Sequence, residues 1–398
     1  MSRCRVCSAA VHEFLDFGRQ PLSSAFRSPG ETEKEFRFRL AVGICGSCTM
    51  VQLLEEVPQG RRAHKGYPYH SSGSTVMHEH FERTARRFLS AELTAADPFF
   101  VEIGYNDGVV LDTVRDAGVR QLAFEPSGEG AGRVHCSFFD TASAQEVRTA
   151  EGPADIIYAA NTLCDVADIA TVLEGADILL APDGVLVFED PYFGEIIERT
   201  SFDQIYDEHF YYFTARSVRA MARRSGFDLV DVERLPVHGG QIRYSLARTG
   251  RRGPTAAVTE LLAEEESRGL TEPETLNGFT ATVATIRTEL VELLRRLTRE
   301  GHRVVGYGAT AKSSTVLNYC GIGPDLVPLV CDSTPSKQGR LTPGTHIPVH
   351  PPQAFSDPYP DYALLFAWNH AEEVMAKEQA FREAGGRWIL YVPDVHIV

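Results

Sequence analysis

The sequence predicts an α/β protein in which a small cysteine-rich module precedes two doubly wound units. Two observations lead to this fold class: a pair of Cys-x-x-Cys motifs near the start, and two separate stretches in which short apolar runs alternate with helical patterns. The expected domains are the module at 1–65, a central Rossmann-like unit at 66–252, and a helical linker with a smaller C-terminal Rossmann-like unit at 253–398.

The N-terminal module has the cysteine spacing of a structural zinc site. Two chelating pairs supply four thiolates to one tetrahedral ion and leave no open position for catalysis. Because so small a module has too little core to stand without a staple, we expect Zn²⁺ here. The alternative is four unrelated buried thiols. The predicted ligands are Cys4, Cys7, Cys45 and Cys48.

Composition limits the class of protein. The 398 residues are 43% hydrophobic, enough for a sizeable core in two or three domains. The net charge of −15 argues against a nucleic-acid partner. The sequence has neither a long apolar run nor the charged start of a signal segment, so we expect a cytoplasmic protein without a membrane partner, monomeric or weakly dimeric.

The central unit carries a predicted parallel sheet with apolar runs at 99–103, 121–124, 154–159 and 184–189. Two more runs, 229–233 and 242–246, are expected to form a hairpin at its edge. Ligands of such sheets bind beyond the carboxyl ends of the strands. Those ends carry Glu102 to Gly108, Glu125-Pro126, Asn161 and Glu189-Asp190.

The turn after the first of these strands indicates the kind of ligand. It lacks the three-glycine dinucleotide spacing and has no lysine for phosphate. Glu102 and Gly104 instead suit the amine, carboxylate and ribose of S-adenosylmethionine, and Glu125 is placed to accept ribose hydroxyl hydrogen bonds. The glycine-rich stretch between Glu125 and Phe138 predicts that one crossover helix is missing or vestigial.

The C-terminal part begins with long predicted helices at 254–300 and continues with a second alternating pattern at 303–398. Its strand-to-helix turn, Gly306-Tyr-Gly-Ala-Thr-Ala-Lys-Ser-Ser314, offers backbone N–H groups to an anion such as a sugar diphosphate. Close packing of strand on helix explains the glycines nearly as well.

A catalytic role is predicted for the stretch Ser201-Phe-Asp-Gln-Ile-Tyr-Asp-Glu-His-Phe-Tyr-Tyr-Phe-Thr214. A histidine flanked by a carboxylate can act as a general base, and a tyrosine can donate to a carbonyl whose oxygen becomes an enolate. Proton abstraction beside a ketone fits this set, and a histidine in an aromatic core is the alternative. A second cluster, Tyr67-Pro-Tyr-His-Ser-Ser-Gly-Ser74, is a candidate lid.

Taken together, these motifs resemble the sugar C-methyltransferases of deoxysugar antibiotic biosynthesis, which methylate C-3 of thymidine-diphosphate (dTDP) 4-keto-deoxysugars in tetronitrose- and kijanose-type pathways. The resemblance spans nearly the whole chain. Besides the four cysteines, it includes Glu-Ile-Gly-x-Asn-Asp-Gly, Asp203-Gln-Ile-Tyr-Asp-Glu-His209, Pro236-Val-His-Gly-Gly240, Val305-Gly-Tyr-Gly-Ala-Thr-Ala-Lys312 and Pro343-Gly-Thr-His-Ile-Pro348.

The resemblance implies roles for individual residues. His209 would be the base that removes the C-3 proton, Tyr206 would lie near the C-4 ketone, Glu208 would orient the pair, and Tyr67 would lie near the transferred methyl group. The implied S-adenosylmethionine contacts are Gly104, Asn106, Asp107, Glu125, Pro126, Asn161 and Leu163. The implied contacts to the dTDP-linked 4-keto-deoxysugar are Asp165, His238, Arg243, Tyr307, Thr310 and Lys312.

Two departures from the family pattern leave alternatives open. Asp165 stands where the family usually has a histidine, and the segment after Glu125 is short. Both changes touch the predicted cleft. The alternatives are 4-ketoreduction with NADPH, alone or beside methyl transfer, and a sugar-nucleotide-binding homologue that transfers no methyl group.

Overall fold

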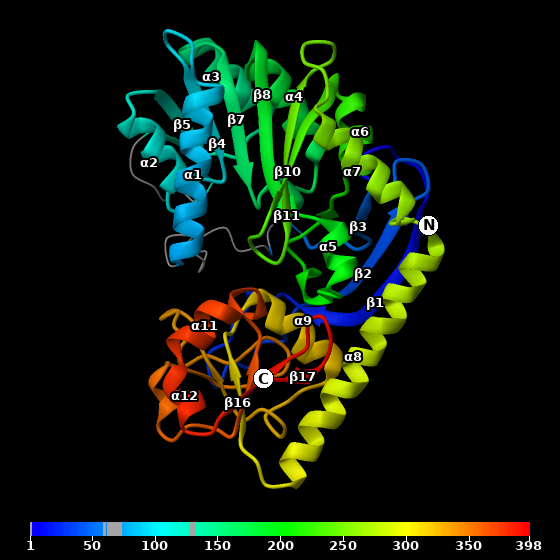
Figure 1. Ribbon diagram of the computed structural model, residues 1–398, viewed down its shortest axis with the longest axis vertical. Coiled ribbons are helices and arrows are strands. Elements are labelled where there is room, and N and C mark those ends of the chain that lie inside the picture. The colour runs from blue at the N-terminus through cyan, green and yellow to red at the C-terminus, as the bar shows by residue number, and fades with distance from the viewer. Residues whose placement is uncertain (1, 59–60, 62–73, 127–132) are drawn as a thin grey trace.

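The computed structural model describes residues 2–58, 61, 74–126 and 133–398 (Figure 1). Within these residues the chain forms a four-stranded, a seven-stranded and a six-stranded sheet, together with helices, which confirms the predicted α/β class. None of the helices in the described ranges combines the length and apolar character needed to cross a membrane.

The N-terminal sheet has the strand order β1-β2-β3-β9. Its first three strands are β1 (Val11–Pro21), β2 (Arg37–Cys45) and β3 (Val51–Leu53), all paired antiparallel. The fourth strand, β9 (Tyr211–Tyr212), comes from the central unit and pairs with β3. The zinc module is therefore completed by a strand from far along the chain, because a single three-stranded sheet buries little apolar surface alone.

The central sheet has the order β10-β11-β8-β7-β4-β5-β6, with β8, β7, β4, β5 and β6 parallel. The antiparallel pair β10–β11 forms the predicted hairpin, which joins the sheet at β8. The strands are β4 (Phe99–Ile103), β5 (Arg120–Phe124), β6 (Val134–His135), β7 (Ala154–Ala160), β8 (Leu180–Pro191), β10 (Phe227–Leu235) and β11 (Gln241–Arg248).

Helices cover both faces of this sheet, as expected for strands that are apolar on both sides. Phe100 on β4 packs with α1 (Thr75–Ala91) and α2 (Val109–Asp116), whereas its neighbours on β4 pack with helices on the other face. Those helices are α3 (Thr141–Glu151), α4 (Ile169–Leu179), α6 (Ala215–Arg224) and α7 (Ala256–Ser267). Only residues 125–133 connect β5 to β6, too few for a normal helical crossover.

The C-terminal sheet has the order β14-β13-β12-β15-β16-β17 and is parallel except for β17. Its strands are β12 (Val304–Tyr307), β13 (Val330–Cys331), β14 (Val349–His350), β15 (Tyr362–Leu365), β16 (Arg387–Leu390) and β17 (His396–Ile397). The helices of this unit are α9 (Ala311–Cys320), α10 (Gln353–Ser356), α11 (Ala371–Lys377) and α12 (Gln379–Glu383).

A single long helix, α8 (Pro273–Arg299), runs along the side of the molecule from the central unit to the C-terminal unit (Figure 1). Its buried residues recur every three or four positions and form one apolar stripe. That stripe belongs to the same core as Leu15 and Phe38 of the N-terminal sheet and Trp388 of the C-terminal sheet. The zinc module and the C-terminal unit are thus packed on one continuous core.

Candidate active site

A cavity of about 850 Å³ lies where the carboxyl ends of β4 and β7 face the N-terminus of α9. This volume is within the usual range for small-molecule sites. All three units contribute to its wall. The lining includes Leu22, Ser24, Ala25, Phe26, Glu102, Gly104, Asn106, Asp107, Glu125, Pro126, Asn161, Asp165, Tyr206, Glu208, His209, His238, Thr310, Lys312 and Lys337.

Glu102 presents one unpaired carboxyl oxygen at one end of this cavity, while the backbone of Leu111 hydrogen-bonds the carboxyl group. The side chain is buried, and its Oε2 has no hydrogen-bond partner within the described ranges. Burial raises the pKa of this carboxyl well above its usual range, and the negative charge of Asp107 raises it further. A buried orphan acceptor fits a ligand that brings amine or hydroxyl donors, as S-adenosylmethionine does.

The adjoining turns hold their shape through unusual backbone angles. Gly104 has a φ of +76°, and a Cβ there would lie 2.4 Å from the Thr162 hydroxyl, so only glycine fits. Asn161 also has a positive φ, and its side-chain oxygen accepts a hydrogen bond from Gln241 on β11. The Asn161 N–H donates to the Glu189 carbonyl at 2.7 Å. One neighbouring strand therefore holds the side-chain amide of Asn161, and another holds its backbone N–H. Gln241 is a supporting residue that the sequence did not indicate.

The loop between η4 (Phe202–Gln204) and β9 joins Tyr206 and His209 in one hydrogen-bonded pair. His209 Nδ1 lies 2.9 Å from the Gln204 carbonyl oxygen, which can only accept, so the ring proton is assigned to Nδ1. Nε2 therefore carries the lone pair and accepts from the Tyr206 hydroxyl at 2.7 Å. Burial, helped by the positive charge of Lys312, lowers the pKa of His209 to about 3. The imidazole is neutral at physiological pH.

Asp165 lies beside this pair. Its Oδ1 is 4.0 Å from His209 Nε2 and accepts a hydrogen bond from the Cys164 thiol at 3.1 Å. Burial raises the pKa of Asp165 well above its usual range, and the nearby carboxylate of Glu208 adds to this shift. A carboxyl group in this surrounding favours its protonated form. In that form Asp165 can donate a proton at the position where the family usually has a histidine.

The C-terminal unit supplies the positive side of the cavity. Thr310 caps α9 by accepting from the Ser313 N–H at 3.1 Å, and Lys312 follows in the first turn. Lys337 donates to the Ala309 carbonyl at 2.9 Å. Burial lowers the pKa of both lysines, while Asp203 opposes the shift at Lys312 and Asp332 opposes it at Lys337. Two amino groups and a capped helix N-terminus form a site suited to an anion.

Asp203 fastens the loop that bears Tyr206 and His209 to this unit; because of the role predicted for it, we call this loop the catalytic loop. Its buried Oδ2 accepts from the Trp368 indole N–H at 2.7 Å and from the Tyr391 hydroxyl at 2.6 Å. Two residues further on, the Ile205 carbonyl accepts from the Thr315 hydroxyl on α9 at 2.8 Å. Three hydrogen bonds therefore hold the loop that bears Tyr206 and His209 against the C-terminal unit.

Three predicted site residues do not line the cavity. Arg243 is buried and does not line the cavity, because its guanidinium donates to protein partners, Glu189, Glu233 and Thr84. The Tyr307 hydroxyl donates to Glu378 at 2.7 Å, and its ring packs in the core of the C-terminal unit. Leu163 is fully buried in the core of the central unit.

The lid predicted around Tyr67 lies outside the described residues, except for Ser74 at its end. The other residues predicted to bind the cofactor, to act with the base or to bind the sugar nucleotide all line the cavity described above.

The four cysteines of the N-terminal module come together as the zinc hypothesis requires. Cys4 Sγ and Cys48 Sγ are 3.5 Å apart, Cys7 Sγ and Cys45 Sγ are 3.3 Å apart, and all four sulfurs lie within 4.8 Å of one another. A tetrahedron with Zn–S bonds of about 2.3 Å has edges of about 3.8 Å, so the donor set fits one zinc ion. The N–H groups of Ser47 and Cys48 also point at Cys45 Sγ.

The fold and the site define an S-adenosylmethionine-dependent methyltransferase with a structural zinc module. Family models agree along the chain: a zinc-binding domain at residues 4–61, a methyltransferase domain at 77–232 and a C-methyltransferase C-terminal domain at 236–393. The C-methyltransferase NovU of Streptomyces niveus is 33% identical over 416 aligned residues, which cover 100% of this chain and 97% of NovU. The chain belongs to the sugar C-methyltransferase family.

Among solved structures, two methyltransferases match over part of the chain with low TM-scores. The 1,6-didemethyltoxoflavin-N1-methyltransferase of Burkholderia thailandensis is 16% identical with a TM-score of 0.35, covering 51% of this chain and 97% of its own. An S-adenosylmethionine-dependent methyltransferase of Archaeoglobus fulgidus is 15% identical with a TM-score of 0.32, covering 40% of this chain and 72% of its own.

Proposed function

We propose that this protein transfers a methyl group from S-adenosylmethionine to C-3 of a dTDP-linked 4-keto-deoxysugar in the biosynthesis of an antibiotic. The observation that carries the proposal is the set of residues that line the 850 Å³ cavity. It joins the acidic turns after β4 and β5, the Tyr206–His209 pair, and the cationic turn before α9. These three parts match a sulfonium donor, an acidic carbon beside a ketone, and a diphosphate.

His209 is the proposed base. Its Nε2 lone pair takes the C-3 proton, and the electron pair of the broken C–H bond moves to the C-4 oxygen as an enolate. The turns after β4 and β5 would hold S-adenosylmethionine, which would supply an electrophilic methyl group to C-3 with S-adenosylhomocysteine as the leaving group. A positioned base of this kind contributes about 10²- to 10⁴-fold to the rate.

Tyr206 explains how the base becomes available. In the structure its hydroxyl donates to Nε2, which occupies the lone pair that must accept the proton. When the ketone enters, the hydroxyl can donate to the C-4 oxygen instead, which frees Nε2 and stabilises the developing enolate. Asp165 Oδ1 lies 4.0 Å from His209 Nε2, and in its protonated form, which burial favours, this carboxyl would be a second donor. Both groups would stabilise negative charge on that oxygen.

The diphosphate of the sugar nucleotide is proposed to bind at the cationic end of the cavity. Thr310, Lys312 and Lys337 line it there, and α9 directs its N-terminal N–H groups toward the same side. Binding energy from this remote anion would hold the sugar ring against the base.

Incubation with methyl-labelled S-adenosylmethionine and a dTDP-4-keto-2,6-dideoxy sugar tests the proposal. We expect label in the sugar, and NMR of the product to place the new methyl at C-3. Replacement of His209 by glutamine should abolish transfer while S-adenosylhomocysteine still binds. Label at C-5 would correct the position, and no transfer by the folded, zinc-loaded protein would refute the function. Adding NADPH to the same mixture tests for reduction of the ketone.

A further inference from the structure

The connection between β1 and β2, residues 22–36, crosses from the zinc module to the C-terminal unit; we call it the strap. Its first part forms cavity wall through Leu22, Ser24, Ala25 and Phe26. These residues belong to the module whose metal site has no chemical role. The zinc module therefore contributes directly to the cavity of the proposed reaction.

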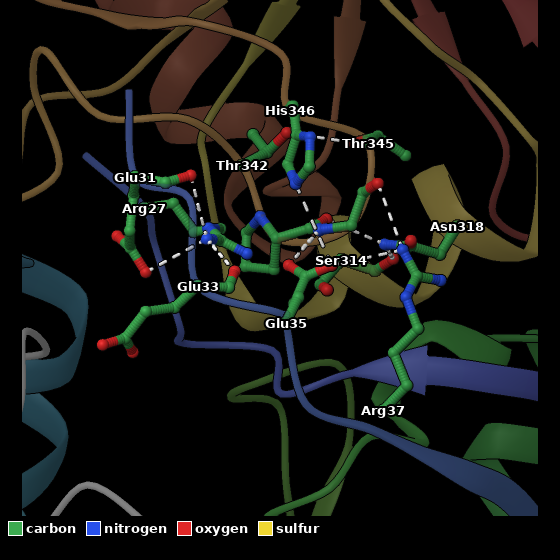
Figure 2. A network of polar contacts seen from close by, with 12 residues as sticks. Arg27, Glu31, Glu33, Glu35, Arg37, Ser314, Asn318, Thr342, Thr345 and His346 are labelled. Carbon is green, nitrogen blue, oxygen red and sulfur yellow. Dashed lines mark hydrogen bonds and ion pairs between the residues drawn. The ribbon is translucent and has the colours of Figure 1, made fainter. Parts of the chain in front are cut away.

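The strap is tied to the C-terminal unit beyond the cavity. Arg27 and Leu341 exchange backbone hydrogen bonds at 3.0 and 2.8 Å. Figure 2 shows the side-chain network that follows: Arg27 binds Glu31 and the Glu33 carbonyl, and Glu35 accepts from the Gly344 N–H at 2.7 Å. The strap begins directly after β1 of the N-terminal sheet, so both of its ends are anchored.

Between these anchors the strap holds the catalytic loop. The Ser23 N–H donates to Asp207 Oδ1 at 2.8 Å, and the Ser24 hydroxyl donates to Glu208 Oε1 at 3.0 Å. Ser23 and Asp207 are buried, whereas Ser24 and Glu208 line the cavity. Both bonds reach a carboxylate, which makes them stronger than bonds between neutral groups.

The two acceptors stand between Tyr206 and His209 in the chain. We propose that Ser24 is a positioning residue: by holding Glu208, it sets where the Tyr206–His209 pair stands relative to the substrate. The proposal rests on the proposed function for its kinetic consequence only. Nothing in it changes the bonds made or broken in the reaction.

Ser24→Ala removes the hydroxyl, and Ser28→Ala makes the same chemical change at an exposed strap position outside the cavity wall. We expect Ser24→Ala to lower kcat about 10- to 100-fold, as small misplacements of reacting groups do, with unchanged affinity for S-adenosylhomocysteine. Ser24→Thr keeps a hydroxyl and should recover most of the rate. Ser28→Ala should behave as the unmodified protein.

A second readout needs no substrate. In ¹⁵N-histidine-labelled protein, the Nδ1 proton that His209 donates to Gln204 should exchange faster with water in Ser24→Ala than in Ser28→Ala. Equal exchange in the two variants, or a Ser24→Ala kcat within twofold of the unmodified protein, would overturn the positioning role. If the unmodified protein transfers no methyl group, the proposed function fails, and the exchange comparison still decides the role of Ser24.

Discussion

Replacing Asp203 with alanine should loosen the joint between the catalytic loop and the C-terminal unit. This buried carboxylate accepts from the Trp368 indole at 2.7 Å and from the Tyr391 hydroxyl at 2.6 Å. Both donors are buried as well, so neither finds water when the acceptor is removed. The Thr315 hydroxyl, which donates to the Ile205 carbonyl, would then remain as a polar anchor of the loop on that side.

The expected loss of stability follows from the two orphaned donors. A buried donor left without its partner costs about 1–3 kcal/mol, so Asp203→Ala should lower the free energy of unfolding by about 2–6 kcal/mol. Asp203→Asn keeps one oxygen that can accept, and should cost about half as much. Lys312 also loses the carboxylate that opposes the lowering of its pKa by burial. The cationic turn then holds less charge, and KM for the sugar nucleotide should rise.

Urea unfolding followed by tryptophan fluorescence suits this test, because Trp368 is one of only two tryptophans. Asp394→Ala is the matched control, since Asp394 is an exposed aspartate of the same unit that pairs locally with His396. The control should stay within about 0.5 kcal/mol of the unmodified protein. A loss below about 1 kcal/mol in Asp203→Ala, with KM unchanged, would show that these bonds do not hold the loop.

Three further predictions concern the base, the cofactor pocket and the metal. Because the pKa of His209 is lowered from about 6.5 unfolded to about 3 folded, its stabilising effect is present above pH 6.5 and is lost as pH falls toward 3. Between pH 7.5 and pH 5 the free energy of unfolding should therefore fall more in the unmodified protein than in His209→Gln. The pH profile of kcat/KM should show no fall centred near pH 6.5, and a midpoint there would contradict the geometry. Glu102→Gln mimics the protonated carboxyl and should change S-adenosylhomocysteine affinity less than about tenfold by calorimetry, while Glu102→Ala should cost more. Removal of zinc by a chelator should abolish methyl transfer in step with metal release, and an active metal-free protein would refute the link through β9.

Apolar periodicity was sufficient to predict the sheets and the β10–β11 hairpin, because strands buried on both faces appear as continuous apolar runs. The stretch 326–332, which we expected to be one strand of the second alternating pattern, shows the limit of this signal. The strand β13 begins only at Val330, after Pro328, which lacks an N–H for the sheet, and the N–H groups of Leu326 and Val327 donate to the Gly323 carbonyl in a turn. Local hydrogen bonding decided a boundary that hydrophobicity alone could not.

Motif membership predicted the site less well than it predicted the fold. Tyr307 lies in a family motif and Arg243 closely follows another, yet both side chains face protein partners. A motif places a residue at the end of a strand, whereas the face on which the side chain stands depends on which partners the neighbouring elements bring. The fold brings Gln241, Lys337 and Ser24 to the site or its support in the same way, through the packing of neighbouring elements. None of these three stands out in the sequence.

The aromatic run after His209 illustrates how a functional pattern can have a structural cause. Its density first indicated catalysis, but Phe210 to Phe213 are all buried, and Tyr211 and Tyr212 form β9 against β3 of the zinc sheet. The aromatic side chains therefore anchor the end of the catalytic loop in the module that zinc holds together. The pairing of β9 with β3 joins the end of this loop to the zinc module, and the strap binds the two residues between Tyr206 and His209. Damage to the zinc site should therefore lower methyl transfer even when the cavity residues are unchanged.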